Sequence, residues 1–236
     1  MNRYIPNQHG AWAMLLLPFL CGLSLSGANW LHIPLFLCWL VMYLFSFPLL
    51  RWIKTRRTTH YRNPTVVYGV ILLPLLTILV WLKPQLLWYS GVLLLLFIPN
   101  IYFARVRNER ALLNDILAII LFCSFIYPVT YIGNETNWRL TSHTFIILVL
   151  YFCGTVLYVK TMIREKNNRT FYHLSISYHI LITILASLYN LILLIPAAIL
   201  LLRSIILPQL KLQTQTIGII EILVALLVSL TLMLLH

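Results

Sequence analysis

The chain alternates between long apolar runs and short polar segments. The apolar runs cover residues 10–28, 33–50, 65–82, 85–104, 112–132, 143–160, 171–189, 191–207 and 216–235. Each run is close to the length of about 20 residues that an α-helix needs to cross a bilayer. Inside a bilayer the backbone polar groups must be satisfied within the segment, which favours helices. The pattern therefore predicts an all-α polytopic transmembrane bundle of about nine spans, forming a single domain over residues 1–236.

The basic residues predict the direction of these spans. Of the 17 Lys and Arg residues, all but Lys83 and Arg139 precede the first run or follow an even-numbered one. Cytoplasmic loops of membrane proteins carry an excess of Lys and Arg. We therefore expect the N-terminus to be cytoplasmic, and an odd number of spans places the C-terminus outside.

Composition excludes a soluble globule. Hydrophobic residues make up 61% of the chain and charged residues 9%, whereas a soluble domain has about 25% charged residues. The net charge of +12 lies in short loops, so we expect no nucleic-acid partner and instead an attraction to anionic lipid headgroups. The chain has no zinc motif, P-loop or pair of acid-rich motifs, and we expect no metal site and no cofactor.

Three basic segments follow even-numbered spans, and their arginines are candidate ligands for an anion. Arginine binds phosphate oxygens through a bidentate fork, so three such segments around one cavity mouth would favour a phosphate or diphosphate. The alternative is that these residues only set the topology and contact lipid headgroups. The same basic segments also carry asparagine and histidine side chains, which the orientation of the spans does not require. The candidate substrate-binding residues are His9, Arg57, Arg62, Arg107, Asn114, Lys160, Arg164, Asn168 and Arg169.

Two residues are candidates for catalytic proton handling. Asp115 begins the fifth span, where it would be either a ligand at a cavity floor or an acid favoured by the helix macrodipole. His179 lies well inside the seventh span, four residues after Ser175 and on the same helical face. An ionisable residue at that depth is expected to have a partner.

Several blocks resemble a known family. The opening Pro6–Met14, followed by Pro18 and Gly22, resembles the start of the YwiC-like bacterial membrane proteins, and residues 107–115 and 158–165 are similar to further blocks of that family. This resemblance implies a multi-pass protein of the cell membrane, the bacterial cytoplasmic membrane.

A second resemblance is to the UbiA prenyltransferase superfamily, whose nine helices surround a cavity that opens to the cytoplasm. Residues 57–64 resemble the basic tail of its first magnesium-binding motif, and residues 158–171 are similar to the region of its second. The acids of both motifs are missing. Lys160, Arg164 and Asn168 stand roughly where carboxylates would be expected.

The UbiA resemblance implies a protein that binds an anionic amphiphile of isoprenoid or quinone type at a cationic cavity on the cytoplasmic side. If it is an enzyme, it would be a degenerate prenyltransferase that lacks the magnesium motifs. The alternatives are a small-molecule transporter and a non-catalytic assembly or accessory protein with a membrane-protein partner. An apolar cavity open to lipid would favour the first hypothesis, a polar path the second, and a filled core the third.

Overall fold

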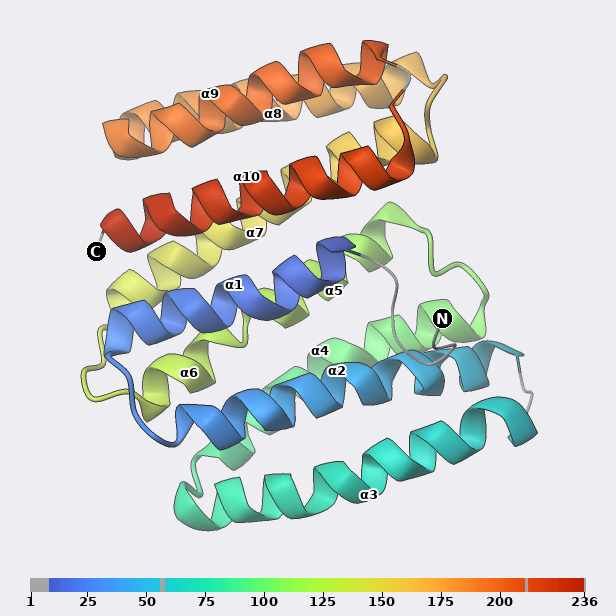
Figure 1. The fold of residues 1–236 in the computed structure, drawn as a ribbon, viewed down its shortest axis with the longest axis vertical. Coiled ribbons are helices and arrows are strands. Elements are labelled where there is room, and N and C mark those ends of the chain that lie inside the picture. Colours follow the sequence, from blue (N-terminus) through green and yellow to red (C-terminus); the bar gives the residue numbers. More distant parts are fainter. Residues whose placement is uncertain (1–8, 56–57, 211, 236) are drawn as a thin grey trace. The chain divides into compact units, whose positions relative to one another are not determined.

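A computed structural model describes residues 9–55, 58–210 and 212–235, and this part of the chain contains helices and no strand. Eight helical segments are long and apolar enough to cross a membrane, and a shorter apolar helix over Gly10–Ser26 accounts for the first run. The predicted all-α polytopic fold is therefore confirmed (Figure 1). The helices in chain order are α1 (His9–Ser26), α2 (His32–Thr55), α3 (Thr58–Leu82), α4 (Leu86–Arg105), α5 (Leu112–Cys123), α6 (Ile126–Ile132), α7 (Trp138–Ile163), α8 (Arg169–Tyr189), α9 (Leu191–Ile206), η1 (Leu207–Gln209) and α10 (Thr214–Leu234).

The fifth run, which we expected as one span over residues 112–132, is a single candidate span that is interrupted at its centre. It is divided into α5 and α6, with Ser124 and Phe125 between them. Proline has no N–H and tolerates only the first turn of a helix, and Pro128 lies in the first turn of α6. Pro128 therefore cannot donate a hydrogen bond to the Ser124 carbonyl, four residues earlier. That carbonyl instead accepts the N–H of Tyr127 at 3.2 Å.

The chain divides into two compact units, residues 1–145 and 146–236, and α7 contributes to both. The expected single domain stays a prediction. In the first unit α2 lies along α3, while α1 packs against α5 and α6, and α4 packs against α2 and α5.

Trp39 is at the centre of the first unit, although a tryptophan in the middle of a span fits neither membrane interface. Its ring stacks on Phe125 with centroids 4.0 Å apart, and its indole N–H donates to the Leu15 carbonyl at 3.3 Å. Trp39 is thus a core residue that links α2 to α1 and to the break between α5 and α6.

The C-terminal ends of α1 and α6 approach each other closely. A Cβ atom placed on Gly133 would lie 2.2 Å from the Cβ of Ser26, and the Ser26 carbonyl accepts the N–H groups of Asn134 and Glu135 at 2.8 and 3.0 Å. The Nε2 atom of His32 is 3.0 Å from the Val129 carbonyl, to which it donates. Small residues allow such approach between membrane helices, and here they let backbone groups of α6 and its following turn bond to the α1–α2 corner.

In the second unit α9 lies beside both α8 and α10 (Figure 1). The very short turn at Tyr189-Asn190 is present as expected, because Asn190 serves both helices. Its N–H donates to the Ala186 carbonyl at the end of α8, and its side-chain oxygen accepts the Ile192 N–H at the start of α9. At the other end of this hairpin, the Tyr172 hydroxyl donates to the Ile205 carbonyl at 3.0 Å.

We predict that Gly133→Ala destabilises the protein by roughly 1–3 kcal/mol, because the new methyl group would overlap Ser26 in a packed interior. Gly91→Ala is the matched control. No atom lies within 4 Å of a Cβ built there, and alanine favours the interior of α4 by up to about 1 kcal/mol. Thermal unfolding in detergent, followed by tryptophan fluorescence, measures both changes. Equal stability of the two variants would contradict the close approach of α1 and α6.

Candidate functional site

Two of the predicted site residues cannot be placed in full. Arg57 lies outside the described residues. His9 is described only as the first residue of α1, and its side chain lies outside the described part. The remaining predicted residues fall in the two units as separate groups, and the shared cavity mouth that would join the groups stays a prediction.

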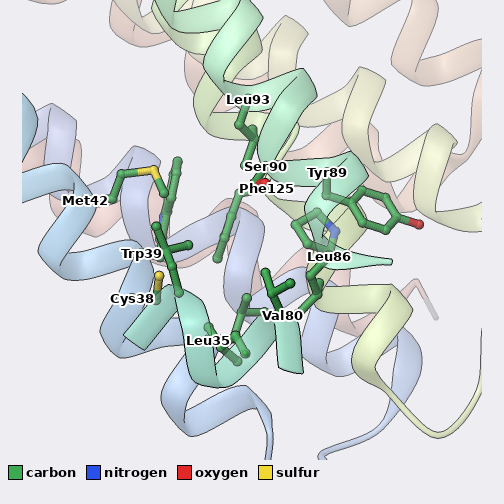
Figure 2. Close-up of a pocket in the computed structure, with 13 residues that line it drawn as sticks. Leu35, Cys38, Trp39, Met42, Val80, Leu86, Tyr89, Ser90, Leu93 and Phe125 are labelled. Carbon is green, nitrogen blue, oxygen red and sulfur yellow. The ribbon is translucent and has the colours of Figure 1, made fainter. Parts of the chain in front are cut away.

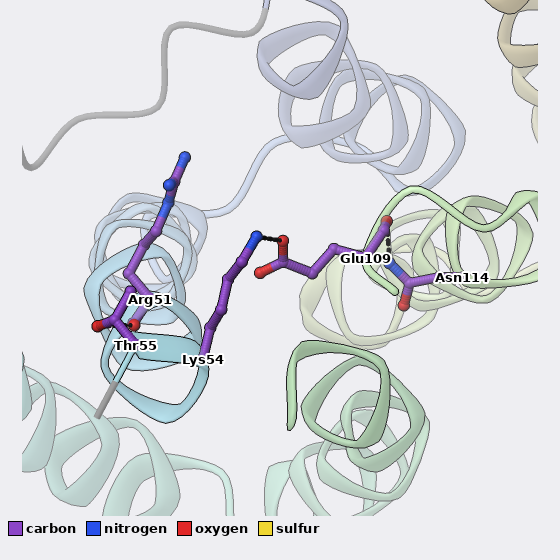
Figure 3. Close-up of polar contacts among 5 residues, drawn as sticks. All are labelled: Arg51, Lys54, Thr55, Glu109 and Asn114. Atoms are coloured by element: carbon purple, nitrogen blue, oxygen red, sulfur yellow. Dashed lines mark hydrogen bonds and ion pairs between the residues drawn. The ribbon is translucent and has the colours of Figure 1, made fainter. Parts of the chain in front are cut away.

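An ion pair brings together the end of α2 and the turn between α4 and α5 in the first unit (Figure 3). The ammonium group of Lys54 binds the carboxylate of Glu109, and the Asn114 side-chain amide donates to the Glu109 backbone carbonyl at 2.9 Å. We name the basic residues at the ends of α2 and α4 and before or at the starts of α3 and α5 the first cationic end; they are Arg51, Lys54, Arg62, Arg105, Arg107 and Arg110. The predicted residues Arg107, Asn114 and Asp115 thus belong to one short stretch that α2 holds in place.

Arg107 has an unusual backbone conformation, with φ at 58°. It occupies the left-handed position just beyond α4, where its N–H bonds to the Ala104 carbonyl at 3.2 Å and the Asn108 N–H bonds to the Phe103 carbonyl at 2.9 Å. Helices that end in this way usually carry glycine at that position. A side chain there costs roughly 1–2 kcal/mol, so the exposed Arg107 is retained at an energetic disadvantage.

Asp115 and Asn114 lie in the first turn of α5 and are both partly buried. Asp115 has an interaction partner, and its position fits the alternative in which the helix macrodipole favours an acid. The side-chain oxygen of Asn114 is buried and accepts no hydrogen bond within the described structure. Of the two residues, Asn114 therefore has an unused acceptor, which a ligand or a water molecule could satisfy.

The first unit also contains a small apolar cavity of about 40 Å³ (Figure 2). Its lining comes from the N-terminal halves of α2 and α4 and the C-terminal half of α3, together with the break between α5 and α6. It therefore lies in the half of these helices away from the first cationic end. The lining residues are Leu35, Cys38, Trp39, Met42, Leu76, Leu79, Val80, Leu86, Tyr89, Ser90, Leu93, Phe125 and Pro128. Such a space has room for part of an apolar chain and not for a charged head group.

The turn between α7 and α8 carries the predicted basic residues of the second unit. Arg164, Asn168 and Arg169 are exposed, whereas Lys160 is buried near the end of α7 and has an interaction partner. Asn168 caps α8, because its side-chain oxygen accepts the backbone N–H groups of Thr170 and Phe171 at 3.1 and 3.3 Å. The position of Asn168 is thus explained by helix capping.

A buried ion pair lies in the interior of the second unit. Nη1 of Arg203 on α9 is 2.6 Å from both carboxylate oxygens of Glu221 on α10, and the two side chains are 3% and 9% exposed. The guanidinium group also lies over the ring of Tyr158 on α7, 4.2 Å from its centroid. Removing two charges from water costs several kcal/mol for each ion, and an ion pair alone often fails to repay that cost.

His179 lies near this ion pair, on α8. Its Nδ1 is 2.7 Å from the Ser175 carbonyl, which can only accept, so Nδ1 carries the proton. Nε2 faces Gly154, where an added Cβ would lie 3.1 Å away, and it has no hydrogen-bond partner among the described residues. The partner that we expected for His179 is therefore a backbone carbonyl on one side, and the other nitrogen is unused.

The buried side chains of the second unit that have unpaired atoms, together with Glu221, form what we call the buried polar cluster. Its members come from all four helices of the second unit, and they are Thr155, Tyr158, Ser175, His179, Arg203 and Glu221. The sequence predicted only His179. Arg203 was assigned to a loop and Glu221 to no role, although both lie inside apolar runs, where an ionisable residue is expected to have a partner. Their opposite charges on consecutive spans were the signal that could have identified the pair.

We predict that Glu221→Ala destabilises the protein by roughly 3–5 kcal/mol, because it leaves the Arg203 charge buried without its partner. The double variant Arg203→Met with Glu221→Leu should recover most of the loss, because apolar side chains of similar size then replace the pair. Thermal unfolding in detergent measures both. If the double variant is as unstable as Glu221→Ala, an unpaired buried charge is not the cause.

The described residues do not fit the magnesium site of UbiA-like enzymes. They contain no group of three or more His, Cys, Asp or Glu side chains placed to hold a metal ion. The whole chain has one Asp, Asp115, and four Glu, so the paired acid-rich motifs have no counterpart.

The comparisons with known proteins agree with the first of the two resemblances. A profile of the family described as YwiC-like protein matches residues 5–131. The chain is 42% identical to a Bacillus subtilis protein named "Uncharacterized protein YwiC". The 190 aligned residues make up 80% of each of the two chains. The chain is also 32% identical to an uncharacterized protein of Haemophilus influenzae. The 225 aligned residues make up 94% of this chain and 93% of the relative. No solved structure matches the chain.

Proposed function

Because this chain belongs to the YwiC-like protein family, and because its helices place exposed arginines at their predicted cytoplasmic ends, we propose that it binds an anionic amphiphile in the membrane. Head groups would contact Arg62 and Arg107 in the first unit and, as a separate group, Arg164 and Arg169 in the second. The tail would lie among the apolar helices. The isoprenoid or quinone nature of the amphiphile follows from the UbiA resemblance, and the location would be the bacterial cytoplasmic membrane.

The left-handed backbone of Arg107 is the observation that carries this proposal. Strained residues persist where the surrounding structure holds them, and they cluster at ligand sites. Glycine would adopt the left-handed conformation at the end of α4 without that cost. Helix termination therefore does not explain why an arginine stands at this position. Recognition of a phosphate or diphosphate supplies one, because arginine binds two of its oxygens at once.

Direct contact between arginines and the anion fits the lack of acid-rich motifs. With no carboxylates placed to hold magnesium among the described residues, the positive charge at the head group comes from side chains. In a transferase, these arginines would stabilise a departing diphosphate. Asp115 in the first unit or His179 in the second would then hold the transferred proton.

A transporter is the second candidate, and the buried ion pair of Arg203 and Glu221 supports it. Ionisable residues within membrane spans commonly mark the paths of ions and polar substrates. A lipid that copurifies with the protein favours amphiphile binding, whereas uptake of a soluble solute into vesicles favours transport.

We predict that Arg107→Gly raises stability by about 1 kcal/mol, because it relieves the left-handed strain, while retention of a diphosphate lipid falls about tenfold or more. Arg164→Ala should also lose the lipid and should remain folded. Mass spectrometry of lipids extracted from the purified protein measures retention, and Arg139→Ala, an exposed arginine near the predicted outer end of α7, is the control. Unchanged retention in both test variants would disprove the proposed contacts.

We also predict that the segments around residues 63 and 166 face the same side of the membrane. In cells, Asn63→Cys and Lys166→Cys should resist a membrane-impermeant maleimide and react in inverted vesicles, while Glu135→Cys should show the reverse. Three native cysteines are buried and Cys153 is half-buried, so the parent chain gives a low background. Labelling of residues 63 and 166 from opposite sides would exclude a shared mouth.

A further inference from the structure

The ion pair in the second unit uses only part of the Arg203 side chain. Both carboxylate oxygens of Glu221 bond to Nη1, whereas Nε and Nη2 are buried and have no hydrogen-bond partner among the described residues. The N–H bonds of Nε and Nη2 point in parallel from one edge of the guanidinium plane. That edge is the fork through which arginine binds a carboxylate or phosphate with two hydrogen bonds. Tyr158 covers a face of the plane and leaves the edge unused.

Further buried polar groups lie on the neighbouring helices of this unit. The Tyr158 hydroxyl on α7, the Ser175 hydroxyl on α8 and Nε2 of His179 are all buried and have no hydrogen-bond partner among the described residues. The buried Thr155 hydroxyl on α7 lies within reach of the Tyr151 side chain. Arg203 lies close enough to Tyr158 and His179 for electrostatic interaction, and Glu221 is similarly close to Tyr158. Buried polar atoms in folded proteins are nearly always paired, so several unpaired atoms in one cluster indicate a missing partner.

The proton on His179 bears on what that partner can be. Since Nδ1–H donates to the Ser175 carbonyl, Nε2 of the neutral ring is an unprotonated acceptor. Arg203 and Glu221 cancel each other's charge, so an anion on the fork would add one uncompensated negative charge to a buried site. Protonation of Nε2 would restore neutrality and would turn this atom into a further donor. The other titratable groups of the cluster are Tyr158 on α7 and Glu221 on α10; Tyr151 on α7 lies within electrostatic range of both charges.

We propose that the second unit contains a buried oxyanion site, in which the Nε–Nη2 edge of Arg203 binds a carboxylate or phosphate and His179 takes up a proton with it. The hydroxyls of Thr155, Tyr158 and Ser175 complete the donor set. The oxyanion is either the head of an amphiphile or a free anion. This site is separate from the exposed arginines at the helix ends, so unchanged binding in variants of the buried site would leave the amphiphile proposal untouched.

The test measures binding of four probes to the full chain in maltoside detergent by isothermal titration calorimetry. Inorganic phosphate and acetate represent free anions, and lysophosphatidic acid and oleate represent amphiphile heads. Arg203→Lys keeps a positive charge for Glu221 and removes the fork, so we expect about tenfold weaker binding or more. Arg139→Lys makes the same replacement at an exposed site and should bind as the wild-type chain does.

Proton uptake is tested with acetate, which stays ionised in water between about pH 6 and about pH 8. Binding to the wild-type chain should tighten toward about pH 6, because protonated His179 then donates to the anion. His179→Gln should bind with little dependence on pH. A pH dependence that survives in His179→Gln would overturn the role of His179.

Tyr158→Phe and Thr155→Val keep the test decisive if Arg203→Lys fails to fold. Tyr158→Phe removes a hydroxyl with no hydrogen-bond partner in the described structure, so a purely structural role predicts no change in binding. Thr155→Val removes a hydroxyl that lies near Tyr151 and keeps the size of the side chain. The oxyanion site predicts a loss of about threefold to tenfold in each. Binding of the amphiphile probes alone identifies a lipid head as the ligand, and binding of the small anions identifies a free anion. Unchanged binding in these variants and in Arg203→Lys, or no binding of any probe, would overturn the proposal.

Discussion

A charge is costly to bury in an apolar helix bundle, and the positions of the few charged residues in this chain follow from that cost. Most basic residues lie at helix ends that we predict to face the cytoplasm, where water and lipid headgroups solvate them. Lys54 and Glu109 form a partly exposed pair at such an end. Arg203 and Glu221 differ from these, because they are buried and pair with each other across α9 and α10. Lys160 is also buried, near the end of α7.

These two environments suit different kinds of recognition. Exposed arginines such as Arg107 and Arg164 attract anions in water, where each contact is weak and screened by salt. The guanidinium group of Arg203 is held by Glu221 and by the ring of Tyr158, so a ligand would meet it already oriented and already desolvated. A hydrogen bond made there is stronger than one in water, and a ligand without a matching acceptor would leave a buried polar group unpaired at a high energetic cost. The buried site is therefore the more selective of the two.

The sequence predicted the helical spans well, because the length of an apolar run is set by the bilayer and does not depend on which helices are neighbours. The turn at Asn190 could be predicted for a local reason, since it separates two apolar runs and asparagine suits turns. In the structure Asn190 also ends α8 and caps α9. The break at Ser124 and Phe125 lies one turn before Pro128, and a proline inside a span is a local signal for such an interruption. The resemblance to the YwiC-like family was correct, whereas likeness to the UbiA superfamily stays a prediction. Of the buried polar cluster only His179 was predicted, because the pairing of Arg203 with Glu221 depends on α9 lying beside α10.

The contact between the α1–α2 corner and the end of α6 has a consequence for how the first unit is assembled. Asn29 and Asn134, which bond across this contact, are 105 residues apart in the chain. While the N-terminal helices emerge from the ribosome, the carbonyl of Ser26 and the ring of His32 must find temporary partners in water or in the insertion machinery. The first helix, which is short for a span, can therefore settle into its final position only after the later helices have been inserted. Its mature arrangement should be a late event in biogenesis, even though it is the first helix to be made.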